Sequence, residues 1–143
     1  MTTDGLTRTR PIMQLRRYLA LLIPVVLLAG CDSRERATRN EIYQLAYRKA
    51  QLQAALEVCD PKAPTTQEHA EAWQEVFESA DGWLGITAAG IANRKAAALE
   101  EPIDVPESAC PTVRKAMKAS LAEATRWSAR VAGKELCGWV SCD

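Results

Sequence analysis

The sequence has few of the side chains on which metal and catalytic sites usually depend. Its 143 residues include one histidine and one phenylalanine, which argues against a metal site built from several histidines. Positive and negative charges balance, with 18 Lys and Arg against 18 Asp and Glu. A neutral chain gives no reason to expect nucleic acid as a partner. We therefore expect no metal ion and no nucleic acid to bind.

Sequence motifs of catalysis are also missing. The chain has no Gly-x-Ser-x-Gly elbow, P-loop, His-Glu-x-x-His motif or dinucleotide-binding fingerprint. The lone His69 lies beside Glu68 on the polar start of a predicted helix, and we expect it to be solvent-exposed. A stripe of carboxylates at spacings of three and four predicts a solvated helix face: Glu68, Glu71, Glu75 and Glu78. These patterns predict neither enzymatic activity nor a small-molecule substrate.

The N-terminal region has the pattern of an export signal. Arg16 and Arg17 precede an uncharged run over residues 18–30. As a helix this run rises about 20 Å, too little to cross a bilayer core of roughly 30 Å. A positive stretch, an apolar run and small residues are typical of a secretory signal. The run ends in Leu28-Ala29-Gly30-Cys31, which resembles the bacterial lipobox, so we expect a covalent lipid on Cys31 and no other cofactor.

This interpretation divides the chain into three parts. Residues 1–30 are predicted to be the signal peptide, with Met13 as a possible true start because the residues before it are polar. Residues 31–39 are predicted to be a lipidated tether, and residues 40–143 a domain with a cysteine-containing tail from about residue 132. The lipid would hold the domain on the periplasmic face of a bacterial membrane, where the environment is oxidising.

Four cysteines remain after Cys31: Cys59, Cys110, Cys137 and Cys142. An even number in an oxidising compartment predicts two disulfides, for which three pairings are possible. We favour Cys59–Cys110 with Cys137–Cys142. The second pair closes a short loop that contains Gly138 for the turn. A metal site is not favoured, because no Cys-x-x-Cys motif is present.

Apolar periodicity predicts four helices and no strand of useful length. Asn40 is a plausible N-cap for the first helix, which ends before Asp60 and Pro61. Thr65 and Glu68 form a capping box at the start of the second. The third is expected from Trp83 to about Leu99, and the fourth has Pro111 in its first turn. The predicted fold is all-α, a small, disulfide-stapled four-helix bundle.

The third predicted helix is unusually thin. It is composed largely of alanine with Gly85 and Gly90, and few large apolar residues interrupt them. Small side chains let another backbone approach closely. The neighbour is either a helix of the same bundle or a visiting amphipathic helix in a groove, and the sequence leaves both possibilities open.

These features together resemble the PulS/OutS family of type II secretion pilotins over about residues 45–125. The similarity rests on the lipobox, on Cys59 at the end of the first helix, on the Ala80–Trp83 junction, on Ile91, and on Cys110 before the last helix. The resemblance implies a four-helix lipoprotein with a disulfide between the two matching cysteines. It also implies a groove that binds the C-terminal helix of a secretin subunit and delivers it to the outer membrane.

Six residues are predicted to line that groove: Trp83, Ile86, Ile91, Leu99, Leu121 and Trp127. The outer membrane is the favoured location. Asp32 departs from this expectation, because in enteric bacteria Asp after the lipidated cysteine retains a lipoprotein in the inner membrane. The alternative is therefore an inner-membrane-anchored periplasmic lipoprotein that blocks or regulates another machine, such as an entry-exclusion factor of conjugation.

Overall fold

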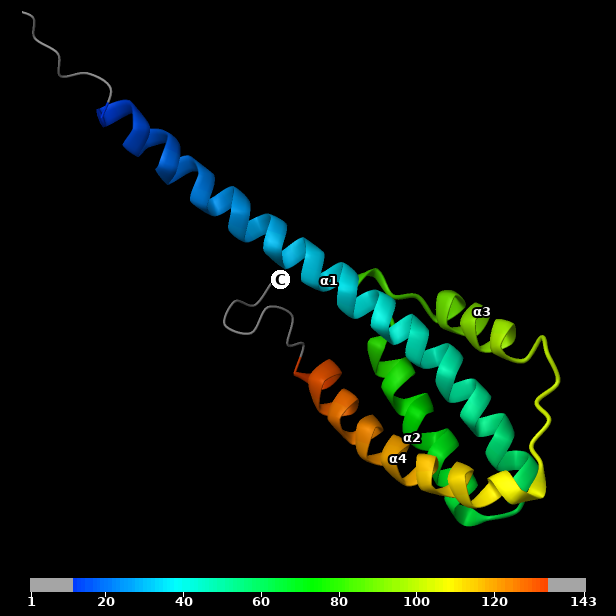
Figure 1. Cartoon of the computed structure of the whole chain (residues 1–143). Coiled ribbons are helices and arrows are strands. Elements are labelled where there is room, and N and C mark those ends of the chain that lie inside the picture. The colour runs from blue at the N-terminus through cyan, green and yellow to red at the C-terminus, as the bar shows by residue number, and fades with distance from the viewer. Residues whose placement is uncertain (1–11, 134–143) are drawn as a thin grey trace, which may run out of the picture.

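The computed structural model describes the chain from residue 12 to residue 133, and its side chains from residue 33. This part is an all-α bundle without β-strands (Figure 1). Two 3-10 turns, η1 and η2, lie between the helices. The elements in chain order are α1 (Ile12–Cys59), α2 (Pro64–Ala80), η1 (Trp83–Gly85), α3 (Ala88–Ala98), η2 (Glu107–Ala109) and α4 (Cys110–Ala132).

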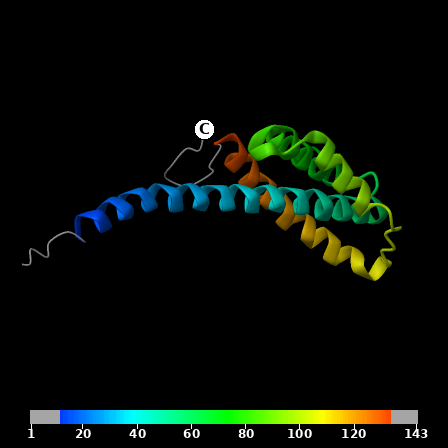
Figure 2. The same ribbon diagram turned by 90° about the horizontal axis from the view of Figure 1, so that it is seen from above.

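Helix α1 is the centre of the bundle. The other three helices pack around its C-terminal half, and its N-terminal half projects beyond them (Figure 1). Helices α3 and α4 lie on different sides of α1 in Figure 1, and the view from above shows that α4 crosses α1 (Figure 2). Helix α2 packs against both α1 and α4 but makes little contact with α3. The buried core is formed by α1, α2, η1, α3 and α4. The predicted small helical bundle is therefore confirmed.

The predicted start of the first helix at Asn40 is wrong, because α1 runs through this position without a break. No proline or glycine lies between Cys31 and Cys59 to interrupt the helix. The polar segment before Asn40 also contacts the bundle, since Thr38 is buried and accepts a hydrogen bond from Arg130 on α4. Charged composition alone predicted a tether, whereas the segment is a helical extension of the first core helix.

The predicted capping box of the second helix is also not formed. Helix α2 begins at Pro64 after Ala63, which has no side chain able to cap it. Proline is favoured in a first turn, since its missing N–H has no helical partner there. The side chain that stabilises this region is Thr66, whose hydroxyl donates to the carbonyl of Asp60 at 2.9 Å.

The third helix is shorter than predicted. Residues 83–85 form η1, in which Leu84 has a left-handed backbone with φ of 55°. Helix α3 begins at Ala88, and Thr87 caps it by accepting a hydrogen bond from the Gly90 N–H at 3.1 Å. This capping hydrogen bond was not recognised from the sequence.

The small residues of α3 serve packing within the bundle at Gly90. A Cβ atom at this position would lie 2.7 Å from the hydroxyl oxygen of Tyr43 on α1. That hydroxyl also accepts a hydrogen bond from the N–H of Thr87 at 3.2 Å. Of the two neighbours left open by the sequence, the one at Gly90 is therefore a helix of the same bundle.

A disulfide joins the end of α1 to the start of α4. Cys59 and Cys110 are bonded, with Cα atoms 5.6 Å apart, as disulfide geometry requires. Beside it the Arg114 guanidinium donates two hydrogen bonds to Asp60, and these hold the pKa of that carboxyl below its ordinary value. The predicted Cys59–Cys110 pair is confirmed, whereas the second pair lies outside the described residues.

We expect loss of this disulfide to destabilise the fold. The double substitution Cys59→Ser/Cys110→Ser removes the cross-link between two residues that are 51 positions apart in the sequence. On the chain-entropy account this costs about 4 kcal/mol of unfolding free energy. Urea unfolding of the variant and the parent, at equal concentration, measures the difference. Identical midpoints in the two proteins would contradict the structural role.

Candidate partner-binding groove

Three helices enclose an open apolar hollow of about 290 Å³ on the surface of the bundle. Its lining includes small residues from α1 and α2, namely Ala50, Ala54 and Ala70. Larger apolar side chains also line it: Trp73 and Phe77 from α2, and Leu99 after α3. The small side chains of the alanines permit close approach by an apolar surface.

A second hollow of about 410 Å³ continues between α2 and α3. It is lined on one side by Ile91 and its neighbours on α3, and on the other by Glu78 and Asp81 from the end of α2. The two hollows share Gln74, Phe77 and Lys95. We refer to both hollows together as the α2–α3 groove. It exists because α2 and α3 both pack on α1 while making little contact with each other.

Two lysines lie over aromatic rings in this groove. The ammonium of Lys95 is 4.9 Å from the centroid of the Phe77 ring, and that of Lys49 is 4.8 Å from the Trp73 ring. Such cation–π contacts are attractive because the ring face carries negative charge density. Lys49 also forms an ion pair with Glu123 on α4. Burial lowers the pKa of Lys95, and nearby Glu78 opposes that shift.

His69 lies beneath the groove and not on the solvent-exposed surface. Its side chain is 1% exposed, so the prediction of a solvated histidine is wrong. Its Nδ1 atom is 2.8 Å from Oε1 of Gln53 on α1, and its Nε2 atom is 2.9 Å from the Ser120 hydroxyl on α4. The Trp73 indole N–H donates to the same hydroxyl at 2.9 Å. This His69 network joins α1, α2 and α4.

The partners of Gln53 determine which nitrogen of His69 carries the proton. Its amide NH₂ group donates to Glu57 and to the carbonyl of Thr66, so its oxygen faces the imidazole. A carbonyl oxygen can only accept, and Nδ1 must therefore donate to it. Nε2 is then unprotonated and accepts from the Ser120 hydroxyl. Both ring nitrogens therefore have a hydrogen-bond partner when the imidazole is neutral.

Burial lowers the pKa of His69 to about 4, and the positive charge of Lys49 adds to this shift. Ser120, although bonded to a histidine, is 2% exposed and is not among the residues that line the groove. The geometry therefore suits the His69 network to holding three helices together while leaving the groove surface above it open.

The structure brings only part of the predicted groove together. Trp83, Ile86 and Trp127 lie in the hydrophobic core and line neither hollow, so the structure does not place them in this groove. Ile91 is buried but borders the second hollow, and Leu99 lies in the wall of the first with 54% of its surface exposed. Periodicity identified apolar positions, but it could not tell which of them a neighbouring helix covers.

Leu121 is half-buried on α4 and does not line either hollow. The residues shared by the two hollows, above all Phe77 and Lys95, were not predicted from the sequence. A partial signal was available on the first helix, where Ala50 and Ala54 lie four residues apart and therefore on one face. The exposed carboxylate stripe on the second helix was predicted correctly.

Several predicted sites cannot be placed. No side chain of Cys31 is described, and Cys137 and Cys142 lie beyond residue 133. Among the described residues, no helix has the length and apolar composition needed to cross a membrane. The same residues contain no cluster of three or more His, Cys, Asp or Glu arranged to hold a metal ion.

The pKa of His69 predicts a stability that depends on pH. The unfolded chain takes up a proton near pH 6.5, whereas the folded chain does so only at about pH 4. Stability is therefore complete above pH 6.5 and falls as the pH drops toward 4, by up to about 3 kcal/mol. Urea unfolding between these values measures it. In the variant His69→Gln the unfolding free energy should no longer fall in this pH range. The same pH dependence in both proteins would contradict the lowered pKa of His69.

Comparison with known proteins identifies no relative: no family model, no curated protein and no solved structure matches this chain.

Proposed function

We propose that this protein is a lipid-anchored adaptor that captures the amphipathic C-terminal helix of a secretin subunit in the α2–α3 groove and delivers it to the outer membrane. The observation that carries this proposal is the groove itself. It is an apolar trough bounded by α2 and α3, and it borders the hydrophobic core at Trp73, Phe77 and Ile91.

The chemistry of the groove suits the apolar face of a helix. The small side chains of Ala50, Ala54 and Ala70 in its lining allow a visiting backbone to approach closely, and Leu99 offers an exposed apolar surface. Binding of an amphipathic helix in an apolar groove is a common mode of peptide recognition. Because the groove is open at the surface, a partner can enter without unfolding the bundle.

The position of the lipidation motif fits an adaptor that works close to a membrane. Helix α1 continues from the predicted lipid site at Cys31 to the groove residue Ala50. At 1.5 Å per residue this segment spans roughly 28 Å. A captured helix would thus be held near the bilayer surface on a rigid support and not on a loose tether.

The choice of a secretin as partner rests on the sequence pattern. The spacing of Cys59, the Gly82–Trp83 junction and Cys110 is similar to that of type II secretion pilotins. The two cysteines are joined by a disulfide here. A second candidate function follows from Asp32. If this residue retains the lipoprotein in the inner membrane, the groove would instead serve to block or regulate another machine, such as a conjugation apparatus.

The binding step can be tested by filling the groove. The variant Ala54→Trp places a large ring in the lining of the first hollow, where we expect it to occupy the space of a visiting helix. A labelled C-terminal peptide of the host's secretin, titrated by fluorescence anisotropy, should bind the parent and bind this variant at least roughly tenfold more weakly, about 1.4 kcal/mol.

A matched control is Ala122→Trp, which makes the same change at an exposed position of α4 outside the groove. It should bind as the parent does. Thermal unfolding confirms that both variants are folded. If the peptide binds none of the three folded proteins at high micromolar concentration, the adaptor proposal fails; equal binding to all three would place the site elsewhere.

The delivery step depends on the predicted lipid. We expect Cys31→Ala to leave peptide affinity unchanged, because Cys31 precedes the bundle, but to leave the secretin outside the outer-membrane fraction. Membrane fractionation of cells with the parent or the variant measures this. Unchanged secretin distribution would contradict delivery, and recovery of the parent protein in the inner membrane would favour the alternative indicated by Asp32.

A further inference from the structure

The side chain of Lys95 divides the α2–α3 groove. It extends from α3 to the face of the Phe77 ring on α2, and both residues belong to the lining of both hollows. Because α2 and α3 make little other contact, this stack is a bridge between two helices that are otherwise separate. Moving Lys95 away from the ring would displace one of the three side chains that line both hollows, the others being Gln74 and Phe77.

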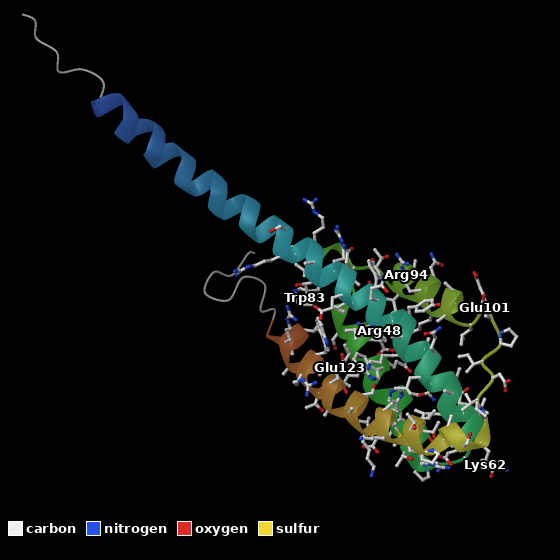
Figure 3. The ribbon with its side chains drawn as sticks, in the orientation of Figure 1. Arg48, Lys62, Trp83, Arg94, Glu101 and Glu123 are labelled. Carbon is white, nitrogen blue, oxygen red and sulfur yellow. A yellow bond between two sulfur atoms is a disulfide. The ribbon has the colours of Figure 1, made fainter. Side chains whose placement is uncertain are left out.

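Lys95 is held by a weak interaction. An ammonium over an aromatic ring gains about 0.5–1 kcal/mol where solvent is near, and Lys95 forms no ion pair with a carboxylate among the described residues. Lys49, which also lines the first hollow, differs because it is paired with Glu123 on α4, a residue labelled in Figure 3. Lys95 is therefore a half-buried cation that is available for a stronger partner.

The charges along the groove indicate what that partner carries. Lys95 lies where the two hollows meet, while Glu57 lines the first hollow, and Glu78 and Asp81 line the second. A complementary helix has apolar residues along one face, a carboxylate at its middle and basic residues toward both ends, where they meet Glu57 in one hollow and Glu78 and Asp81 in the other. Such an arrangement fixes the register of the helix.

We propose that Lys95 is a clasp that determines specificity: a partner helix displaces its ammonium from Phe77, and an Asp or Glu in the middle of the partner's apolar face pairs with it. This inference rests on the proposed function, because it assumes that a helix enters the groove. It goes further by naming the residue that selects the helix and the chemistry that is selected.

A double-mutant cycle tests the clasp. The variant Lys95→Met removes the charge and keeps an unbranched apolar side chain. The probes are the C-terminal secretin peptide and versions of it in which each Asp or Glu is replaced singly by Asn or Gln. We expect one replacement to weaken binding to the parent protein about tenfold, and to have no effect on binding to Lys95→Met. The coupling would be about 1.4 kcal/mol.

The control is Arg94→Met, which removes a positive charge from the adjacent, exposed position of the same helix (Figure 3). The peptide replacement that weakens binding to the parent protein should also weaken binding to Arg94→Met about tenfold. If the parent peptide binds but no carboxylate couples to Lys95, the clasp is wrong while the proposed function stands. If no peptide binds any folded variant, the proposed function fails and the clasp with it.

A second measurement does not depend on substitution of Lys95. In the free protein the ε-methylene protons of Lys95 lie over the Phe77 ring and should resonate upfield because of its ring current. On saturation with the secretin peptide we expect this upfield shift to disappear as the ammonium leaves the ring. A shift that persists in the complex would show that Lys95 stays on Phe77 and would overturn the clasp.

Discussion

The neutral imidazole of His69 is the interaction on which the arrangement of the bundle depends. It donates to Gln53 on α1 and accepts from Ser120 on α4, and thereby fixes α2 against both. A buried polar ring is tolerable only when every hydrogen-bonding atom has a partner. Three helices must therefore keep their register together. Phe77 continues the same buried stripe of α2 and borders the groove where the stripe approaches α3.

The groove follows from the way α3 is attached. Gly90 packs against the ring of Tyr43, so α3 docks closely on α1 and lies away from α2. A larger residue at position 90 would push α3 outward, whereas a larger apolar surface on α2 would draw it inward and close the space. The groove is thus open because α3 packs closely on α1 but makes little contact with α2.

The sequence was sufficient to predict the number of helices, the absence of strands in the described part and the Cys59–Cys110 disulfide, because helical periodicity and cysteine chemistry are local or pairwise signals. It was misleading for His69. This residue lies on the same helical stripe as Thr66 and Trp73, both buried, but its polar character suggested the surface. Only the partners Gln53 and Ser120, 16 and 51 residues away, make its burial possible.

The groove was harder to predict for a related reason. Trp83 and Trp127 were predicted to line the groove because they are large and apolar, yet neighbouring helices cover them. The actual groove combines alanines with a lysine over a phenylalanine, and none of these is conspicuous in the sequence. The groove also shares Trp73, Phe77 and Ile91 with the hydrophobic core, and His69 with the hydrogen-bond network beneath it. The same side chains that keep the bundle folded therefore shape the surface that a partner would meet.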